Sequence, residues 1–435
     1  MSWLIVAGFL IFFLGMALSI GLHELGHLVP AKIFGVKVTQ YMVGFGPTMW
    51  SRRRGETEYG MKWIPLGGYI RMVGMLPPKP NADPTKLRTM STGPWQGLIE
   101  TARQASLEEI KPGDGDRVFY RKPWWQKVII MAGGPAMNFL LAFGLFAVVI
   151  MGFGIPVSKP IVSVVSECVM TQAEQAKGQE CTPAHPPTPA ALAGLKTDDK
   201  IVSLAGKPVT TWEEATRVIR AHGAGPIAIG IERGGKPMTL NANLVAQDRP
   251  SIDDPTKIDK GAGFLGVSAT VVMEKQGFGY AAGVMWDLTK RSAEAITRFP
   301  QKIVGVWQAA FGGGERDVTS PMSVVGAGRI GGEIAAAPVP VENKIVGLLQ
   351  LLAGVNLAVG LFNLIPLLPL DGGQIAGGLW EGLKRGYARV RRRPAPGHVD
   401  IAKALPLTYA MAAVLLVMGT LLIYADIVNP IRLSG

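Results

Sequence analysis

The sequence predicts a membrane protein with four transmembrane helices, a membrane-associated β-hairpin region and a separate α/β module. The first observation behind this fold class is that 48% of the 435 residues are hydrophobic. The second is that four runs reach the roughly 20 apolar residues that a spanning helix needs. The third is that basic residues are unevenly distributed between these runs. The apolar runs are residues 3–22, 128–155, 345–370 and 405–427.

Basic residues indicate the topology. Residues 31–125 hold 15 Lys and Arg against 8 Asp and Glu, and residues 371–404 hold 7 against 3, whereas residues 153–342 hold 19 of each. Because Lys and Arg collect on the cytoplasmic side of membranes, the first two segments are predicted to face the cytoplasm. Both termini and residues 153–342 then lie outside it, in a multi-pass protein of the inner (plasma) membrane.

The basic run KRGYARVRRR, residues 384–393, could suggest nucleic-acid binding. Beside a membrane helix, such a run is more typical of a topology signal that touches anionic lipid head groups. We therefore predict membrane lipids as partners of this segment, and no nucleic acid.

The first apolar run could be mistaken for a signal peptide. It lacks a basic n-region and a small-residue cleavage site, and it continues directly into the motif HELGH at residues 23–27. The run is therefore predicted to be a retained transmembrane helix.

The other segments differ in composition. Residues 36–71 alternate and are rich in β-branched and aromatic residues around the turn RRRGET, which predicts β-hairpins. Residues 157–246 contain strand-like runs, a capped helix in TWEEATRVIRAH and a hairpin around Gly234-Gly235. The predicted domains are 1–35, helix one with HELGH; 36–125, cytoplasmic-side β-hairpin region and loop; 126–156, helix two; 157–246, α/β module; 247–342, linker and amphipathic helix; 343–371, helix three; 372–404, basic cytoplasmic loop; and 405–435, helix four and tail.

The sequence leaves the structure of three segments open. One amphipathic helix is possible near 95–110. The apolar residues of 285–311 recur at steps of three and four, so this helix either lies on the membrane surface or packs on the α/β module. Cys168 and Cys181 either form a disulfide, which an oxidising compartment favours, or remain free thiols.

The motif HELGH carries the first candidate site. His23 and His27 are four residues apart, so on a helix they share a face and can bind one ion. Neutral imidazoles suit Zn²⁺, and Glu24 can take a proton from water bound to it. A structural metal or a hydrogen-bonded pair is the alternative. Ionisable groups at membrane depth are costly and persist mainly at polar sites, which favours a functional site toward the cytoplasmic side.

A catalytic zinc ion needs a third protein ligand, and Asp371 is the best candidate. It follows the third apolar run in NLIPLLPLDGGQ, at the depth expected for His23. The prolines before it interrupt regular helix, which is tolerated in a membrane only where backbone lines a site. Asn363 projects from the same interrupted stretch.

These motifs resemble those of the site-2 proteases, which are intramembrane zinc metalloproteases. The resemblance continues through GFGP (44–47), IPLGGYIRM (64–72), MAGGPAMNFLLA (131–142) and TSPMSVVGAGRI (319–330), and it covers nearly the whole chain. It is strongest to bacterial members with a single PDZ domain that cleave anti-sigma factors. The module 157–246 is similar to a PDZ domain, although Asp198-Asp199 stands where Gly-Asp is usual. Gln374 stands where many relatives have histidine.

The resemblance implies a function and a set of site residues. The function is hydrolysis of peptide bonds within transmembrane segments of single-pass proteins, as the second cut of regulated proteolysis of anti-sigma factors. His23, His27 and Asp371 are implied to hold Zn²⁺, Glu24 to be the general base, and Asn363 to position substrate or stabilise the oxyanion. The segments GFGP and IPLGGYI are implied to form a membrane-dipping β-structure, and we expect an unwound substrate to pair with its edge strand. The residues expected to bind substrate are Gly44, Gly46, Ile64, Pro65, Leu66, Gly67, Gly68 and Tyr69.

Two other functions compete with this one. A catalytically inactive membrane adaptor would bind peptides through its PDZ-like domain, but a degenerate metal site should have lost at least one of His23, Glu24, His27 and Asp371. A zinc transporter would need polar residues along several helices, and helices two and four carry few besides Asn138 and Asp426.

Overall fold

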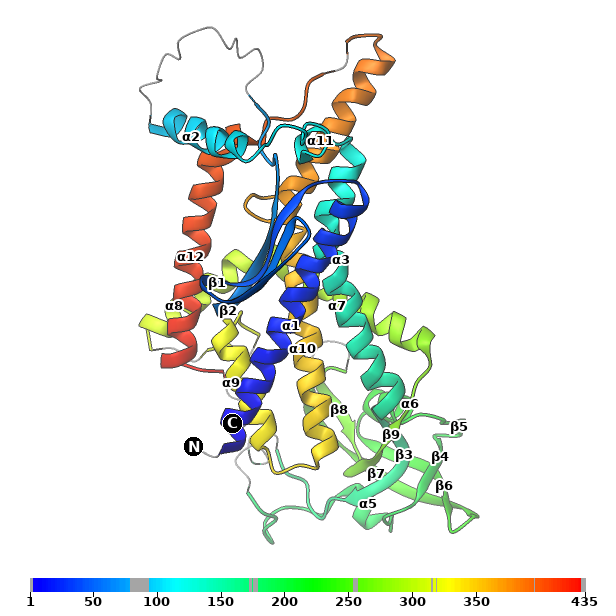
Figure 1. The fold of residues 1–435 in the computed structure, drawn as a ribbon. Helices are drawn as coiled ribbons and strands as arrows, with labels where there is room; N and C mark the ends of the chain where they lie inside the picture. Colours follow the sequence, from blue (N-terminus) through cyan, green and yellow to red (C-terminus); the bar gives the residue numbers. More distant parts are fainter. Residues whose placement is uncertain are drawn as a thin grey trace. The chain divides into compact units, whose positions relative to one another are not determined.

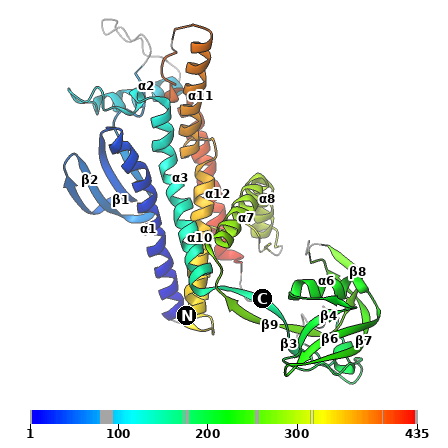
Figure 2. The same ribbon diagram turned by 90° about the vertical axis from the view of Figure 1, so that its right-hand side faces the viewer.

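The computed structural model describes residues 3–78, 94–171, 174, 179–252, 257–313, 316–317, 319–394 and 396–431. The chain divides into two compact units (Figures 1 and 2). A helical unit comprises Met1–Gly152 and Gly277–Gly435, and a sheet unit comprises Phe153–Gln276.

Four helices of the described residues are long and apolar enough to cross a membrane, in agreement with the four predicted runs. Helices α1, α3 and α10 run side by side (Figure 2). Helix α12 packs on two shorter helices, α8 (Phe299–Phe311) and α9 (Val324–Ala336) (Figure 1). The chain is therefore a membrane protein. The long helices are α1 (Trp3–Ile33), α3 (Trp124–Ala147, continued by a π-helical turn Val148–Phe153), α10 (Val341–Asn363) and α12 (Leu405–Val428).

The third spanning helix is shorter than predicted. It ends at Asn363, residues 364–370 form turns, and a new helix, α11, covers Asp371–Val390. The prediction of a basic loop over 372–404 is therefore wrong for its first half. Its many glycines and basic residues favour a loop, although its apolar residues recur at helical spacing. Glycine lets α11 lie close to α3: a Cβ at Gly378 would lie 2.9 Å from a methyl carbon of Val128.

Strands β1 (Val38–Arg54) and β2 (Thr57–Met72) form the predicted β-hairpin region. The ribbon folds back on itself, because residues 40–43 of β1 are paired both with 68–71 and with 58–61 of β2. Residues 68–72 are consequently at an edge of this small sheet, where no other strand of the described residues pairs with them. Both strands contact α1.

The shorter helices of this unit pack on the long ones. In place of one amphipathic helix there are two, α7 and α8: Met285 of α7 packs with Ala142 of α3 and Leu357 of α10, and Val306 of α8 packs with Leu422 of α12. Helix α9 was not predicted and packs along α1. The helix expected near 95–110 is present as α2. Their bounds are α2 (Pro94–Glu108), α7 (Phe278–Thr297), α8 (Phe299–Phe311) and α9 (Val324–Ala336).

The sheet unit contains the predicted strands, capped helix and Gly-Gly hairpin. Thr211 caps α6 through a capping box with Glu214, and β6 and β7 meet at Gly234-Gly235. In the described residues the sheet has the order β8-β7-β6-β4-β3-β9. The elements are β3 (Ile155–Val165), α5 (Pro189–Leu192), β4 (Lys200–Leu204), β5 (Lys207–Pro208), α6 (Trp212–His222), β6 (Gly225–Arg233), β7 (Lys236–Pro250), β8 (Ile258–Phe264) and β9 (Val267–Glu274).

The sheet unit is larger than the predicted module. Residues assigned to a linker after residue 246 instead extend β7 and form β8 and β9. The linker prediction was wrong there because 247–263 is rich in charge, proline and glycine. Backbone pairing at the sheet edge forms these strands, and that pairing leaves little trace in hydrophobic alternation.

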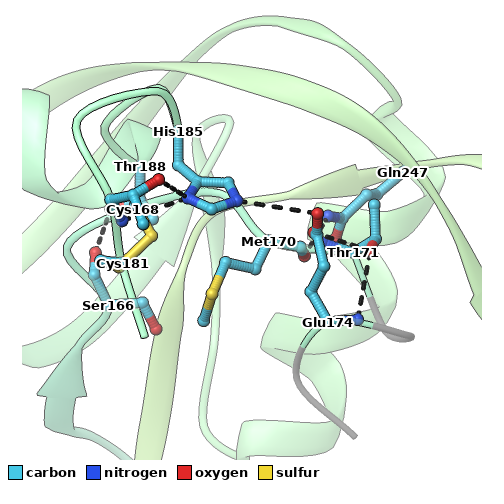
Figure 3. Close-up of a disulfide and its surroundings, with 10 residues drawn as sticks. Ser166, Cys168, Met170, Thr171, Glu174, Cys181, His185, Thr188 and Gln247 are labelled. Atoms are coloured by element: carbon cyan, nitrogen blue, oxygen red, sulfur yellow. Dashed lines mark hydrogen bonds and ion pairs between the residues drawn. A yellow bond between two sulfur atoms is a disulfide. The ribbon is translucent and has the colours of Figure 1, made fainter. Parts of the chain in front are cut away.

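Cys168 and Cys181 form a disulfide, so the alternative of two free thiols is wrong (Figure 3). The loop that it closes is tied to its surroundings. The side-chain amide of Gln247 donates to the Met170 carbonyl at 2.8 Å, and the Thr188 hydroxyl donates to the Ser166 carbonyl at 2.5 Å.

Candidate metal centre

Three potential ligand atoms from α1 and α11 meet inside the helical unit. His23 and His27 lie one turn apart on α1, and their Nε2 atoms are 3.3 Å apart. Asp371, the first residue of α11, brings its Oδ2 to 3.4 Å from Nε2 of His23 and 3.3 Å from Nε2 of His27. Asp371 is more than 300 residues from the histidines in the chain. The turns at 364–370, between α10 and α11, bring its carboxylate to them.

The cluster fits a tetrahedral zinc ion. Nitrogen and oxygen ligands at about 2.0–2.2 Å from zinc stand roughly 3.3–3.5 Å from one another. Both histidines are buried, and Oδ2 of Asp371 is a buried oxygen with no hydrogen-bond donor among the described residues. A buried carboxylate oxygen without a donor is costly unless a cation binds it. Three protein ligands also leave one tetrahedral position open, which is typical of catalytic rather than structural sites.

Helix α3 orients both imidazole rings. Nδ1 of His27 donates to the Ile130 carbonyl at 2.8 Å, which leaves Nε2 free to bind a metal. The amide of Asn138 lies 3.1 Å from Nδ1 of His23, and an amide can serve this ring nitrogen through either of its ends. Sequence reasoning did not assign Asn138 to the site. Its signal was a single amide side chain on an apolar helix.

Glycines bring α3 close enough for this role. A Cβ at Gly133 would lie 2.0 Å from the Gly26 carbonyl oxygen, and one at Gly134 would lie 2.2 Å from Nε2 of His27. The sequence GGP of α3 therefore occupies space that any side chain would block. The backbone of α3 can approach the two imidazole rings this closely only because residue 134 is glycine.

Glu24 and Asn363 open onto the same space. A cavity of about 260 Å³ adjoins the ligand cluster. Glu24 lies next to His23 and contacts β2, where a Cβ at Gly68 would be 2.9 Å from its Cγ. The cavity is lined by Met16, Ser19, Ile20, His23, Glu24, Gly67, Gly68, Asn138, Val355, Asn356, Val359, Asn363, Pro369, Leu370 and Asp371.

A protein-family model described as peptidase family M50 matches residues 11–404, a span that includes every residue of this cluster. The chain belongs to peptidase family M50.

Relatives of this M50 peptidase carry matching names. It is 34% identical to the zinc metalloprotease Rip1 of Mycobacterium tuberculosis H37Rv over 98% of this chain and 99% of the relative. It is 26% identical to the zinc metalloprotease RasP of Geobacillus kaustophilus (86% and 87% covered) and 27% identical to a putative zinc metalloprotease of Rhizobium meliloti (83% and 83%). The predictions of a site-2 protease family member, of a metalloendopeptidase and of zinc as cofactor are confirmed.

Only some of the residues predicted to bind substrate line the cavity of the M50 peptidase. Gly67 and Gly68 line the cavity, whereas Gly44, Gly46, Ile64, Pro65 and Tyr69 belong to the ribbon but not to the cavity wall. Tyr69 stacks on Phe45, and the side chain of Leu66 lies outside the described part.

Gln374, which stands where the sequence resemblance places histidine in many relatives, is one turn after Asp371 on α11. Its Oε1 is buried, and no described residue donates to it. The side chain lines a second, much smaller cavity together with Lys127 and Glu381. Gln374 is therefore not part of the ligand cluster.

Proposed function

We propose that this M50 peptidase hydrolyses peptide bonds inside the transmembrane segments of single-pass membrane proteins, at a zinc ion held by His23, His27 and Asp371. The single observation that carries the proposal is the position of the cluster. The three ligand atoms and Glu24 adjoin a 260 Å³ cavity whose walls come from α1, α3 and α10, which are all long enough to span a membrane.

The protein side chains have distinct roles in this proposal. Zinc, when bound, supplies activation of water and polarisation of the peptide carbonyl. Glu24 takes the proton of the attacking water and later gives it to the leaving amine. Asn363, on the cavity wall at the end of α10, donates a hydrogen bond to the developing oxyanion. Ile130 and Asn138 hold the imidazoles so that Nε2 of each ring faces the metal.

Substrate binding is proposed at the edge of the β-ribbon. A scissile peptide in a transmembrane helix is shielded by its own backbone hydrogen bonds, so it has to unwind. Residues 68–72 offer a strand edge beside Glu24, and pairing with it satisfies the backbone groups that unwinding exposes. Gly44, Gly46 and 64–69 shape this ribbon.

Proline substitution tests the pairing. The backbone N–H of Ile70 hydrogen-bonds Glu24, so Ile70→Pro withdraws a donor both from the strand edge and from the proposed base; it should lower cleavage while zinc content stays intact. Arg53→Pro, on an exposed part of the ribbon remote from the cavity, is the matched control and should cleave normally. Normal cleavage by Ile70→Pro would refute strand pairing.

The sheet unit is proposed to be a PDZ-like domain outside the cytoplasm. Support comes from its sequence resemblance, from the capped helix α6 and from the disulfide, which is typical of oxidising compartments. Such a domain limits which substrates enter, for example by excluding those with bulky outer parts, so that cleavage of an anti-sigma factor follows a first cut by another protease. The exposed basic end of α11 is proposed to contact anionic lipid head groups on the cytoplasmic side.

The decisive experiment uses the purified full chain. A panel of single-pass transmembrane segments is incubated with the wild type and with Glu24→Gln, with and without a zinc chelator. Cleavage that disappears in Glu24→Gln and with chelator, and returns when zinc is added back, supports the protease. Peptide binding by the sheet unit without any cleavage, by a protein that is fully loaded with zinc, would support the inactive adaptor instead.

A further inference from the structure

One face of α3 contacts both proposed histidine ligands, although α3 itself carries no ligand. Ile130 binds His27 through its carbonyl, Gly134 lies against both imidazoles, and Asn138 meets His23. Their spacing of four residues puts them in one row on the helix. Lys127, three residues before Ile130, continues this row toward α11.

Lys127 makes a buried ion pair with Glu381 of α11. The Nζ–Oε2 distance is 2.7 Å, and the exposed fractions of the two residues are 6% and 1%. Arg385 and His398 also face Glu381, at 2.7 Å and 3.4 Å from Oε1. Two charges this deeply buried are costly to desolvate, so such a pair is weak evidence for stability and better explained by a need for one specific arrangement.

The rest of the contact between α3 and α11 is apolar and, in the part of the chain that the structure describes, makes no hydrogen bond that fixes a direction. Val128 and the Trp124 ring of α3 lie against Gly378 and Gly382 of α11, and Ile375 packs near Ile130. Among the described residues, α3 is the element with which α11 makes its most extensive contact. The ion pair adds a charged, directional contact to this apolar packing.

The register of α11 decides where Asp371 lies. Asp371, Gln374, Gly378 and Glu381 are three or four residues apart and share a face of α11. A slip of one residue would move the carboxylate about 1.5 Å along the helix and turn it by about 100°. Metal–ligand distances tolerate changes of only about 0.2 Å. The Lys127–Glu381 pair, about 15 Å along α11 from Asp371, lies where it can fix this register.

We propose that Lys127 and Glu381 are positioning residues of the metal centre: their buried ion pair fixes α11 against α3 and so places the Asp371 carboxylate beside His23 and His27. The inference rests on the proposed ligand set. It assigns to α3 the role of a template that aligns both histidines and the aspartate.

The test removes both charges at once, because removing Glu381 alone would leave Lys127 buried without its partner, and removing Lys127 alone would leave Glu381 held by Arg385. In Lys127→Met/Glu381→Met, apolar side chains of similar length fill the same volume. Zinc affinity, measured by competition with a chelator, should fall about 10–100-fold, and the Co²⁺ absorption spectrum should lose its tetrahedral signature. Thermal stability of the metal-free protein should not fall, since apolar replacement of a buried pair is often neutral or stabilising.

A matched control separates positioning from general packing. Arg316→Met/Asp426→Met removes a second buried ion pair, with 2.5 Å between Nη1 and Oδ1, which lies at α12 and touches none of the proposed ligands. Its zinc affinity should equal that of the wild type. Lys127→Arg, which keeps the charge, should bind zinc within about threefold of the wild type, well inside the loss expected from breaking the pair.

The outcomes decide between this inference and its premise. Wild-type zinc affinity in Lys127→Met/Glu381→Met, or an equal loss in the Arg316/Asp426 variant, overturns the positioning role. If the methionine variant does not fold, Lys127→Gln/Glu381→Gln, which keeps a neutral hydrogen-bonding pair, is measured by the same criteria. An Asp371→Ala variant that binds zinc as the wild type does would overturn the ligand set itself.

Discussion

Replacing Gly134 by alanine adds one methyl group beside the ligand nitrogens. The new Cβ would lie 2.2 Å from Nε2 of His27 and 2.7 Å from Nε2 of His23. Ordinary van der Waals contacts of a Cβ begin near 3.4 Å. Either α3 or the His27 ring must therefore move by about 1.2 Å, which is several times the 0.2 Å tolerance of a metal–ligand bond.

The expected result of Gly134→Ala is loss of a ligand contact with little loss of fold. Displacement of one ring at a three-ligand site should lower zinc affinity by at least the 10–100-fold seen when residues supporting a ligand are changed. Cleavage of a model transmembrane segment should fall in parallel at limiting zinc. Zinc content after dialysis against a weak chelator and thermal unfolding of the same samples measure the two effects.

Gly144→Ala is the matched control for this substitution. Gly144 is on the same helix, and a Cβ there meets nothing within 4 Å. Alanine also has the higher helix propensity, so this variant should fold at least as well as the wild type and bind zinc equally. If Gly134→Ala keeps wild-type zinc affinity and cleavage, the close approach of α3 to the imidazoles is not what holds the site.

Three further predictions concern the sheet unit. Arg233 donates hydrogen bonds to Asp199 and lowers the pKa of that carboxyl. The stability gained is fully present above the ordinary pKa of about 4 and is lost as the pH falls through the lowered pKa of the folded state. Asp199→Asn should therefore make the melting temperature depend less on pH at the acid side. Thr211→Ala should cost about 1 kcal/mol in denaturant unfolding, since it removes the cap of α6, and an unchanged midpoint would contradict this. Replacing Cys168 and Cys181 by serine should cost about 3 kcal/mol through release of the loop, and equal melting with and without reductant would argue against it.

Local sequence was sufficient for features that depend on neighbours in the chain. The spacing of His23 and His27 placed both rings on one helical face, and the capping box of Thr211 and Glu214 predicted the start of α6. The apolar runs gave the spanning helices because a bilayer imposes a minimum length on any helix that crosses it.

Edges and interruptions were less predictable. Strand β8 forms at the sheet edge from a run rich in charge and glycine, and α11 begins only after the turns that follow α10, so neither was recognised from local sequence. The two helices α7 and α8 in place of one were decided by what they pack against, which an amphipathic pattern does not specify.

The sequence by itself determined the kind of chemistry here: an imidazole pair with a glutamate between them, four spans, and a candidate aspartate at the end of the third apolar run. Only the tertiary structure decided how closely these groups meet. Asn138, Gly134 and the Lys127–Glu381 pair act across the helix interface, with partners remote in the chain. Residues on one helix report their own periodicity, but a contact between helices depends on the register of both, and that register follows from packing in three dimensions.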